Sequence, residues 1–158
     1  AQGLRTAEWP ARFQRLFRGP LVDALPAHWE LWLDGGHNEA AARVVAAETA
    51  RWQRDGDPRP LHLVFGMLNS KEPTEFLRPL SGQAASVGTV TIPGEPNALP
   101  ASELAEIAGN LGLEARAFGT VEEALAGAVA REAESGGPAR VLICGSLYLA
   151  GRILADNG

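Results

Sequence analysis

The residues best suited to chemistry lie in one run, Asp-Gly-Gly-His-Asn at positions 34–38. Asp34 directly follows the apolar triplet 31–33, and a segment with helical spacing of apolar residues begins after Asn38. A strand that ends in a glycine turn and leads into a helix leaves free amide groups at the helix N-terminus, and these attract phosphate. The run therefore indicates an anion site beside Asp34, His37 and Asn38.

The same run also has a purely structural interpretation. Asn38 would cap the helix, Asp34 would end the strand in a turn, and His37 would lie on the surface. The clustering of an acid, two glycines, a histidine and an amide at positions 34–38 favours a functional role over this alternative.

Lys71 and Ser146 are the other candidates, because each follows an apolar run of strand length. The structural alternatives are a solvated surface charge for Lys71 and a helix cap for Ser146. Ligands of parallel α/β sheets bind beyond the carboxyl ends of the strands. We therefore predict that Asp34, His37, Lys71 and Ser146 lie along one edge of a sheet.

Short apolar runs alternate with segments of helical period, and this alternation is typical of a parallel sheet with crossover helices. The runs predict five strands, at 31–33, 61–65, 87–92, 114–118 and 141–144, with an additional edge strand or hairpin at 13–17. Helices are expected near 41–52, 73–80, 104–111 and 121–129 and after Ser146, the first with Ala41, Val44, Val45 and Trp52 on one stripe. The predicted fold class is α/β, a mostly parallel sheet with helices on both faces.

Length, charge and cysteine content narrow the class of protein. The 158 residues fit one domain, with 1–30 as a leading segment that includes the edge strand. A net charge of −5 without a run of Lys or Arg argues against nucleic acid as a partner. The single cysteine, Cys144, lies in an apolar run, so we expect no internal disulfide, no metal site and a reducing, cytoplasmic setting.

Several other classes are disfavoured by what the sequence lacks. No apolar stretch approaches the ~18–20 residues that span a bilayer, so no membrane segment is expected. The chain has neither a Gly-x-x-x-x-Gly-Lys phosphate loop nor a Gly-x-Gly-x-x-Gly run, and Ser146 is not set in Gly-x-Ser-x-Gly. Because the start at Ala1 has no initiator Met, we expect a segment of a longer protein.

Four segments, in order along the chain, resemble motifs in the C-terminal domain of folylpolyglutamate synthase/dihydrofolate synthases, which are related to the Mur ligases. Positions 34–38 resemble Asp-Gly-Ala-His-Asn, and Trp-Pro-Ala-Arg at 9–12 resembles Trp-Pro-Gly-Arg. Phe-Gly-Met-Leu-Asn-Ser-Lys-Glu at 65–72 resembles Gly-Met-Leu-x-Asp-Lys-Asp, and 145–151 match the closing Gly-Ser-Leu-Tyr-Leu-Ala-Gly. The departures include Ala11 for Gly, Gly36 for Ala and Glu39 for a frequent Pro.

The resemblance implies a Rossmann-like domain of an ATP-dependent ligase that joins L-glutamate to a folate or to dihydropteroate. Arg12, Asp34, His37 and Asn38 would then contact ATP, and Lys71 and Ser146 would act near the acyl phosphate or the incoming glutamate. In that family the phosphate loop, the Mg²⁺ ligands and most of the folate site belong to an N-terminal domain. The isolated chain would therefore be inactive.

Two alternatives remain open at this point. The chain could be a free-standing nucleotide-binding or regulatory module, or the C-terminal domain of a cell-wall Mur ligase. The residues at 66–68 and 145–151 resemble the folate branch more than the cell-wall branch. The sequence leaves open whether the parent enzyme adds the first glutamate, extends the tail, or does both.

Overall fold

Strand β6 lies inside the sheet although it is the last strand along the chain. The computed structural model describes residues 11–158, in which six strands pair in the order β1-β2-β6-β3-β4-β5. Neighbouring strands are parallel, except that β1 and β2 are antiparallel. The strands are β1 (Gln14–Leu16), β2 (Glu30–Leu33), β3 (Leu61–Phe65), β4 (Ser86–Thr89), β5 (Ala115–Ala117) and β6 (Arg140–Cys144).

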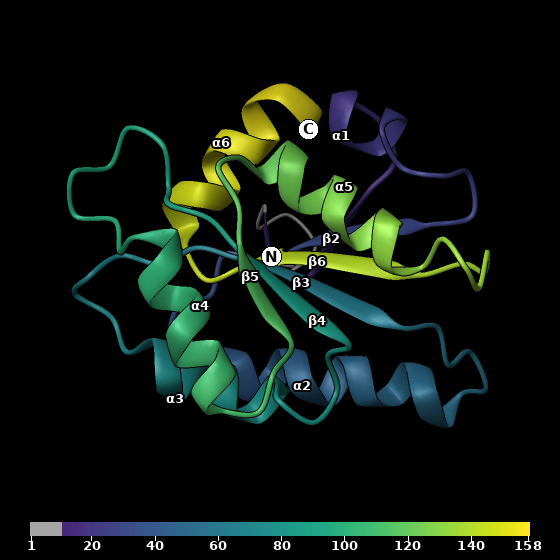
Figure 1. Ribbon diagram of the computed structural model, residues 1–158, viewed down its shortest axis with the longest axis horizontal. Coiled ribbons are helices and arrows are strands. Elements are labelled where there is room, and N and C mark those ends of the chain that lie inside the picture. Colours follow the sequence, from purple (N-terminus) through teal and green to yellow (C-terminus); the bar gives the residue numbers. More distant parts are fainter. Residues whose placement is uncertain (1–10) are drawn as a thin grey trace, which may run out of the picture.

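Helices cover both faces of this sheet, so the predicted α/β fold is confirmed. Figure 1 shows α2, α3 and α4 along one face and α1, α5 and α6 along the other. Within residues 11–158 no helix has the length and apolar character needed to cross a membrane. The helices are α1 (Pro20–Asp23), α2 (Glu39–Arg54), α3 (Pro73–Leu77), the 3-10 helix η3 (Arg78–Leu80), α4 (Ala101–Asn110), α5 (Val121–Arg131) and α6 (Leu147–Asn157).

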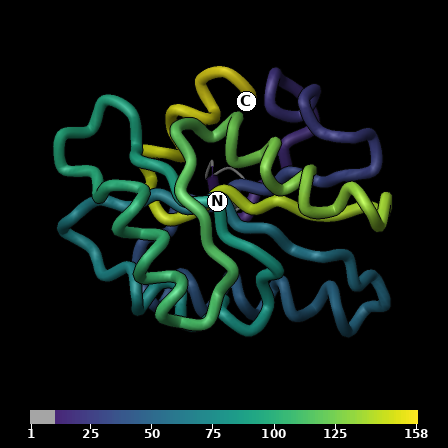
Figure 2. Tube along the Cα trace, viewed as in Figure 1, coloured from purple at the N-terminus to yellow at the C-terminus, as the bar shows by residue number. Residues whose placement is uncertain are grey.

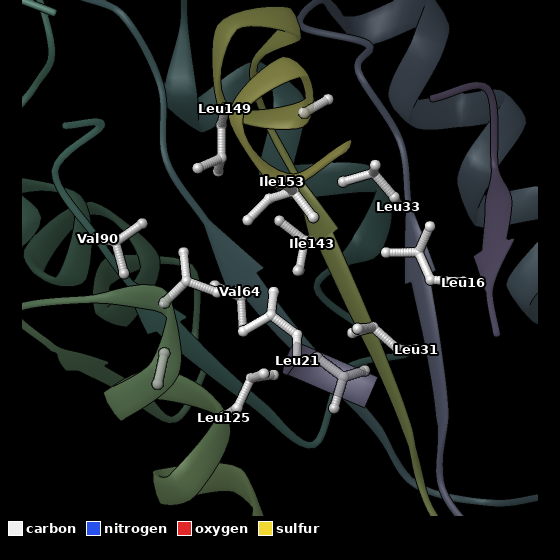
Figure 3. Close-up of a cluster of buried hydrophobic side chains, with 14 of the residues drawn as sticks. Leu16, Leu21, Leu31, Leu33, Val64, Val90, Leu125, Ile143, Leu149 and Ile153 are labelled. Atoms are coloured by element: carbon white, nitrogen blue, oxygen red, sulfur yellow. The ribbon is translucent and has the colours of Figure 1, made fainter. Parts of the chain in front are cut away.

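The side chains of β6 alternate between two hydrophobic cores, as the pleat of a strand requires. Val141 and Ile143 pack in the core beneath α5 and α6, which Figure 3 shows around Ile143, Leu149 and Ile153. Leu142 and Cys144 pack in the core beneath α2, α3 and α4. Both faces of β6 are therefore buried, which explains why residues 141–144 form a continuous apolar run.

Side-chain caps begin three of the long helices. The Asn38 Oδ1 atom accepts the Ala41 amide at 2.8 Å, and the Thr120 Oγ1 atom accepts the Glu123 amide at 3.1 Å. Ser146 caps α6 in the same way. These bonds satisfy amides that have no partner inside the helix, so the caps fix where each helix starts.

Several sequence-based expectations about element boundaries and faces were wrong. The strand predicted at 87–92 ends at Thr89, and the helix α1 was not predicted. Val44 is 62% exposed, and the buried residues of α2 are Ala42, Val45, Ala46 and Thr49. Small alanines fit where η3 packs against α2, so the apolar stripe is rotated away from the larger Val44.

A buried ion network holds the edge of the sheet at which the parallel strands begin. The Arg140 side chain donates to the Glu30 carboxylate at 2.9 Å and to the Asp57 carboxylate at 2.8 Å, and Arg59 contacts both acids. Burial raises the pKa of Glu30, but hydrogen bonds from Trp32 and Arg140 and the nearby positive charges outweigh it and hold the pKa below its ordinary value. Glu30 is therefore charged at neutral pH and stabilises the fold.

The substitution Glu30→Gln should lower the free energy of unfolding by about 1.5–3 kcal/mol, because Arg140 is only 3% exposed and would lose a charged hydrogen-bond partner. Since the pKa of Glu30 is lowered in the folded state, this contribution is present above pH 4.5 and is lost as the pH falls through the folded pKa. Glu48→Gln, which removes an exposed pair with Arg51, should cost at most about 0.5 kcal/mol. Chemical denaturation of both variants tests this, and equal losses would contradict it.

Candidate functional site

The sequence-predicted site residues follow strands whose carboxyl ends point the same way. β6 is parallel to β2 on one side and to β3 on the other. The segments after these strands, 34–38, 66–72 and 145–146, therefore meet at one edge of the sheet, and Figure 2 shows the loop 66–72 projecting at the left. The prediction that Asp34, His37, Lys71 and Ser146 lie along one edge is confirmed.

A crevice opens at this edge because the chain leaves neighbouring strands in opposite directions. The segments after β2 and β3 lead to α2 and α3 on one face, whereas the segment after β6 leads to α6 on the other (Figure 1). Diverging loops of this kind leave a crevice in which ligands of α/β proteins bind. A cavity of about 340 Å³ lies here, and its lining is His37, Leu68, Ser70, Lys71, Gly145, Ser146, Leu147 and Tyr148.

The cavity brings His37, Lys71 and Ser146 together from three separate segments. Arg12, Asp34 and Asn38 are not among its lining residues, so the structure divides the predicted site into a cavity group and a neighbouring group. The segments that carry the two groups lie close together, because a Cβ atom added at Gly35 would lie 3.0 Å from the Cδ1 atom of Leu147, which lines the cavity.

His37 supplies a ring nitrogen that is ready for a ligand. Its Nδ1 atom is buried and has no hydrogen-bond partner within residues 11–158. A buried polar atom without a partner costs free energy, so such atoms are rare outside functional sites. A phosphate or hydroxyl group in the cavity would satisfy this nitrogen.

Ser146 is buried and already serves as the cap of α6. Its Oγ atom accepts the amides of Tyr148 at 3.0 Å and Leu149 at 3.3 Å. The hydroxyl proton is still available as a donor, because both of these bonds use oxygen lone pairs. Ser146 therefore presents one donor at a helix N-terminus, an arrangement suited to a carboxylate or phosphate oxygen.

Asp34 is 8% exposed, and both of its carboxylate oxygens accept backbone amides. Oδ1 accepts from Phe13 and Oδ2 from Gly36, each at 2.9 Å. Burial raises the pKa of Asp34, and these two hydrogen bonds and the positive charge of Arg12 oppose the shift. The carboxylate thus joins the segment that carries Arg12 to the turn that carries His37.

Five lining residues of the cavity were given no role from the sequence: Leu68, Ser70, Gly145, Leu147 and Tyr148. Leu147 and Tyr148 are 60% and 56% exposed, which is high for large apolar side chains, and both follow Ser146 directly. The signal that could have found them is their place in the first turn of α6. Large apolar side chains are usually buried, so exposure at the mouth of a cavity marks a contact surface.

A nucleophilic cysteine and a metal site are both absent from the described part of the chain. Cys144 is 1% exposed, and burial, with the negative charge of Asp34 in addition, raises the pKa of its thiol far above the ordinary value. A thiol of this kind is not a nucleophile at neutral pH. Within residues 11–158 no three His, Cys, Asp or Glu side chains are grouped so that they could hold a metal ion.

The α/β fold, with a crevice where the chain leaves neighbouring strands in opposite directions, agrees with a comparison to known families. The profile described as "Mur ligase, glutamate ligase domain" matches residues 18–147. The chain therefore belongs to the Mur ligase family, in which it corresponds to the glutamate ligase domain.

The chain is also similar to several folylpolyglutamate synthases. It is 26% identical to folylpolyglutamate synthase of Lacticaseibacillus casei over 96% of this chain and 30% of the relative. Folylpolyglutamate synthase of Mycobacterium tuberculosis, solved with ADP and AMPPCP, matches with a TM-score of 0.71 and 25% identity over 95% of this chain and 33% of that one. A bifunctional folylpolyglutamate synthase/dihydrofolate synthase with Mn, AMPPNP and L-glutamate bound matches with a TM-score of 0.68 and 29% identity over 98% and 33%. The chain spans about a third of the length of these relatives.

Gly145 and Gly151 belong to one motif, but the structure requires only the first to be glycine. Gly145 has a φ of 109°, and an added Cβ would overlap the Gly66 carbonyl oxygen and lie 2.7 Å from the Phe65 ring. Gly145→Ala should therefore lower the free energy of unfolding by roughly 2–5 kcal/mol.

Gly151 is the matched control, because it lies within α6 and a Cβ there would meet nothing within 4 Å. Gly151→Ala should raise the stability by about 0.5–1 kcal/mol through its better helix propensity. Thermal or chemical unfolding of the two variants checks that Gly145→Ala lowers the stability and that Gly151→Ala raises it. A stable Gly145→Ala protein would show that the close approach of 145 to β3 is not needed.

Proposed function

We propose that residues 1–158 act as the C-terminal domain of an ATP-dependent folate–glutamate ligase, to which they contribute contacts to ATP and to glutamate. The observation that carries this proposal is the cavity in which His37, Lys71 and Ser146 meet beyond the ends of β2, β3 and β6. Membership of the Mur ligase family and the resemblance to folylpolyglutamate synthases support it.

The cavity residues suit the anions that such a ligase handles. His37 would donate to a phosphate oxygen through a ring nitrogen, and Lys71 would neutralise charge on the transferred phosphoryl group or the acyl phosphate. Ser146 would donate to a carboxylate or phosphate oxygen from the N-terminus of α6. Positioning and charge neutralisation supply most of the catalysis of phosphoryl transfer. A domain that contributes only part of an active site can fill these roles.

Arg12, Asp34 and Asn38 form the neighbouring group and would serve the nucleotide. Arg12 has five donors in a planar fork, which matches phosphate or ribose oxygens. Asp34 and Asn38 each accept backbone amides and keep lone pairs that could accept from ribose hydroxyls. Their structural bonds hold them in place before ATP arrives.

The overall reaction forms an amide in two steps. The γ-phosphoryl group of ATP passes to a carboxylate of a folate or of dihydropteroate, and ADP leaves. The amino group of L-glutamate then attacks the acyl phosphate, and inorganic phosphate leaves. Mg²⁺ would neutralise the ATP phosphates, but the described residues offer no acidic cluster to hold it, so its ligands belong to the N-terminal phosphate-loop domain in this proposal.

The isolated chain should bind ATP weakly, with a dissociation constant above about 1 μM, and should show no ligase activity. It offers only a few contacts, and its sequence has no phosphate loop. Isothermal titration calorimetry with the 158-residue chain measures this directly. A dissociation constant of about 1 μM or tighter would favour a free-standing nucleotide-binding module.

Lys71 is the one lysine of residues 1–158, so a lysine label found within this domain is assigned to it. A nucleotide probe with a lysine-reactive acyl phosphate should acylate Lys71 in the full-length protein, and excess ATP should prevent the labelling. Peptide mapping identifies the site. Labelling that ATP does not reduce would mean that Lys71 lies outside the nucleotide site.

In the full-length protein, His37→Ala and Lys71→Ala should each lower kcat/KM for ATP-dependent glutamate addition about ten- to a hundredfold, the cost of one hydrogen bond to a charged group. Neither side chain packs in the core clusters, so the melting temperature should stay near that of the wild type. Cys144→Ala is the control, because this buried thiol should affect stability modestly and turnover hardly at all. Variants that melt lower yet turn over normally would favour the structural interpretation of the motif.

A further inference from the structure

Two residues with unusual backbone angles flank Arg12. Ala11 has a φ of 63° and Phe13 a φ of 47°, and within residues 11–158 they are the non-glycine residues with positive φ. This region is costly for residues with a Cβ atom and persists only where surrounding contacts enforce it. We refer to residues 11–13 as the Arg12 turn.

Hydrogen bonds from three different residues hold the Arg12 turn. The Gln14 Oε1 atom accepts the Ala11 amide at 2.8 Å, and the Asp34 Oδ1 atom accepts the Phe13 amide at 2.9 Å. The Ala11 carbonyl accepts the Gly35 amide at 2.6 Å. The peptide groups on both sides of Arg12 are thus tied to fixed partners.

Packing holds the same two flanking residues. Ala11 is 4% exposed and belongs to the core beneath α6. The Phe13 ring lies 4.8 Å from the Trp32 ring and 5.4 Å from the Trp52 ring, centroid to centroid. Arg12 itself is exposed, and the packing contacts described here are made by its two neighbours.

The turn lies at the edge of the sheet that carries the site. Gln14 pairs with Leu33, the last residue of β2, and β1 runs antiparallel to β2. Arg12 therefore lies beyond the carboxyl end of β2, beside Asp34 and Gly35. A rigid turn at this place fixes the backbone position from which the Arg12 side chain extends. Less conformational entropy is therefore lost when the Arg12 guanidinium binds an anion.

We propose that Gln14 is a positioning residue which, together with Asp34, holds the Arg12 turn so that Arg12 meets the nucleotide in a fixed place. This proposal rests on the proposed function, in which Arg12 contacts ATP. Gln14 lies outside the motifs, and within residues 11–158 the hydrogen bond of its amide oxygen is with the Ala11 backbone. Loss of that bond should weaken ATP binding without removing an atom that touches ATP.

The test is a double-mutant cycle in the full-length protein, with the ATP dissociation constant and the KM for ATP as readouts. Arg12→Ala should raise both by about ten- to a hundredfold, and Gln14→Ala by about two- to tenfold, the range for one neutral hydrogen bond. In the Arg12→Ala background, Gln14→Ala should have no further effect, because the group that it positions is gone.

Gln83→Ala is the matched control. Gln83 is also half-buried, and its Nε2 atom donates to the Ala46 carbonyl at 3.0 Å in a different part of the domain. Its Oε1 atom also accepts the Thr49 hydroxyl. This variant should therefore lose at least as much stability as Gln14→Ala and leave ATP binding unchanged.

The outcomes separate this proposal from the proposed function. If Gln14→Ala leaves the ATP constants unchanged, or if its effect adds to that of Arg12→Ala, the positioning role is overturned while the nucleotide site stands. If Arg12→Ala has no effect although ATP still protects Lys71 from labelling, the proposal about the turn is also overturned. If ATP fails to bind the full-length protein at all, the proposed function fails as well.

Discussion

The position of β6 between β2 and β3 is the constraint on which the rest of the structure depends. Its parallel hydrogen bonds with both neighbours bring segments more than 100 residues apart to one edge of the sheet. The helix after β6 covers the opposite face from those after β2 and β3, and this divergence opens the cavity. Without β6 the turn 34–38 and the loop 66–72 would have no common edge.

Much of this arrangement follows from the sequence, because strands buried on both faces leave continuous apolar runs such as 61–65 and 141–144. The same reasoning placed the site residues at one edge, since the carboxyl ends of parallel strands must meet. The sequence-based prediction was wrong where side-chain packing determines which face of a helix is buried or where a strand ends. The buried face of α2 uses Ala42 and Ala46 instead of Val44. The chain leaves β4 after Thr89 although Val90 and Ile92 are buried and β-branched, which suits a strand.

The details of the candidate site depended on backbone geometry that residue types do not reveal. The sequence offered helix caps as the structural alternative for Asn38 and Ser146, and both caps are present. That both carboxylate oxygens of Asp34 accept backbone amides had no signal in the residue types. The positive φ values of Ala11 and Phe13 have no signal in the residue types. In this domain the side chains that would meet ligands also hold the loops, so stability and ligand recognition share the same atoms.

The two outer strands of the sheet have a consequence for solubility. β1 and β5 are each three residues long, and each carries an arginine at its middle position, Arg15 and Arg116. A longer edge with apolar side chains would offer unpaired amides and carbonyls to another chain, and a charged, short edge discourages such pairing. The sheet therefore ends on both sides in strands that are poor templates for aggregation, which suits a domain whose opposite surfaces are already committed to helices.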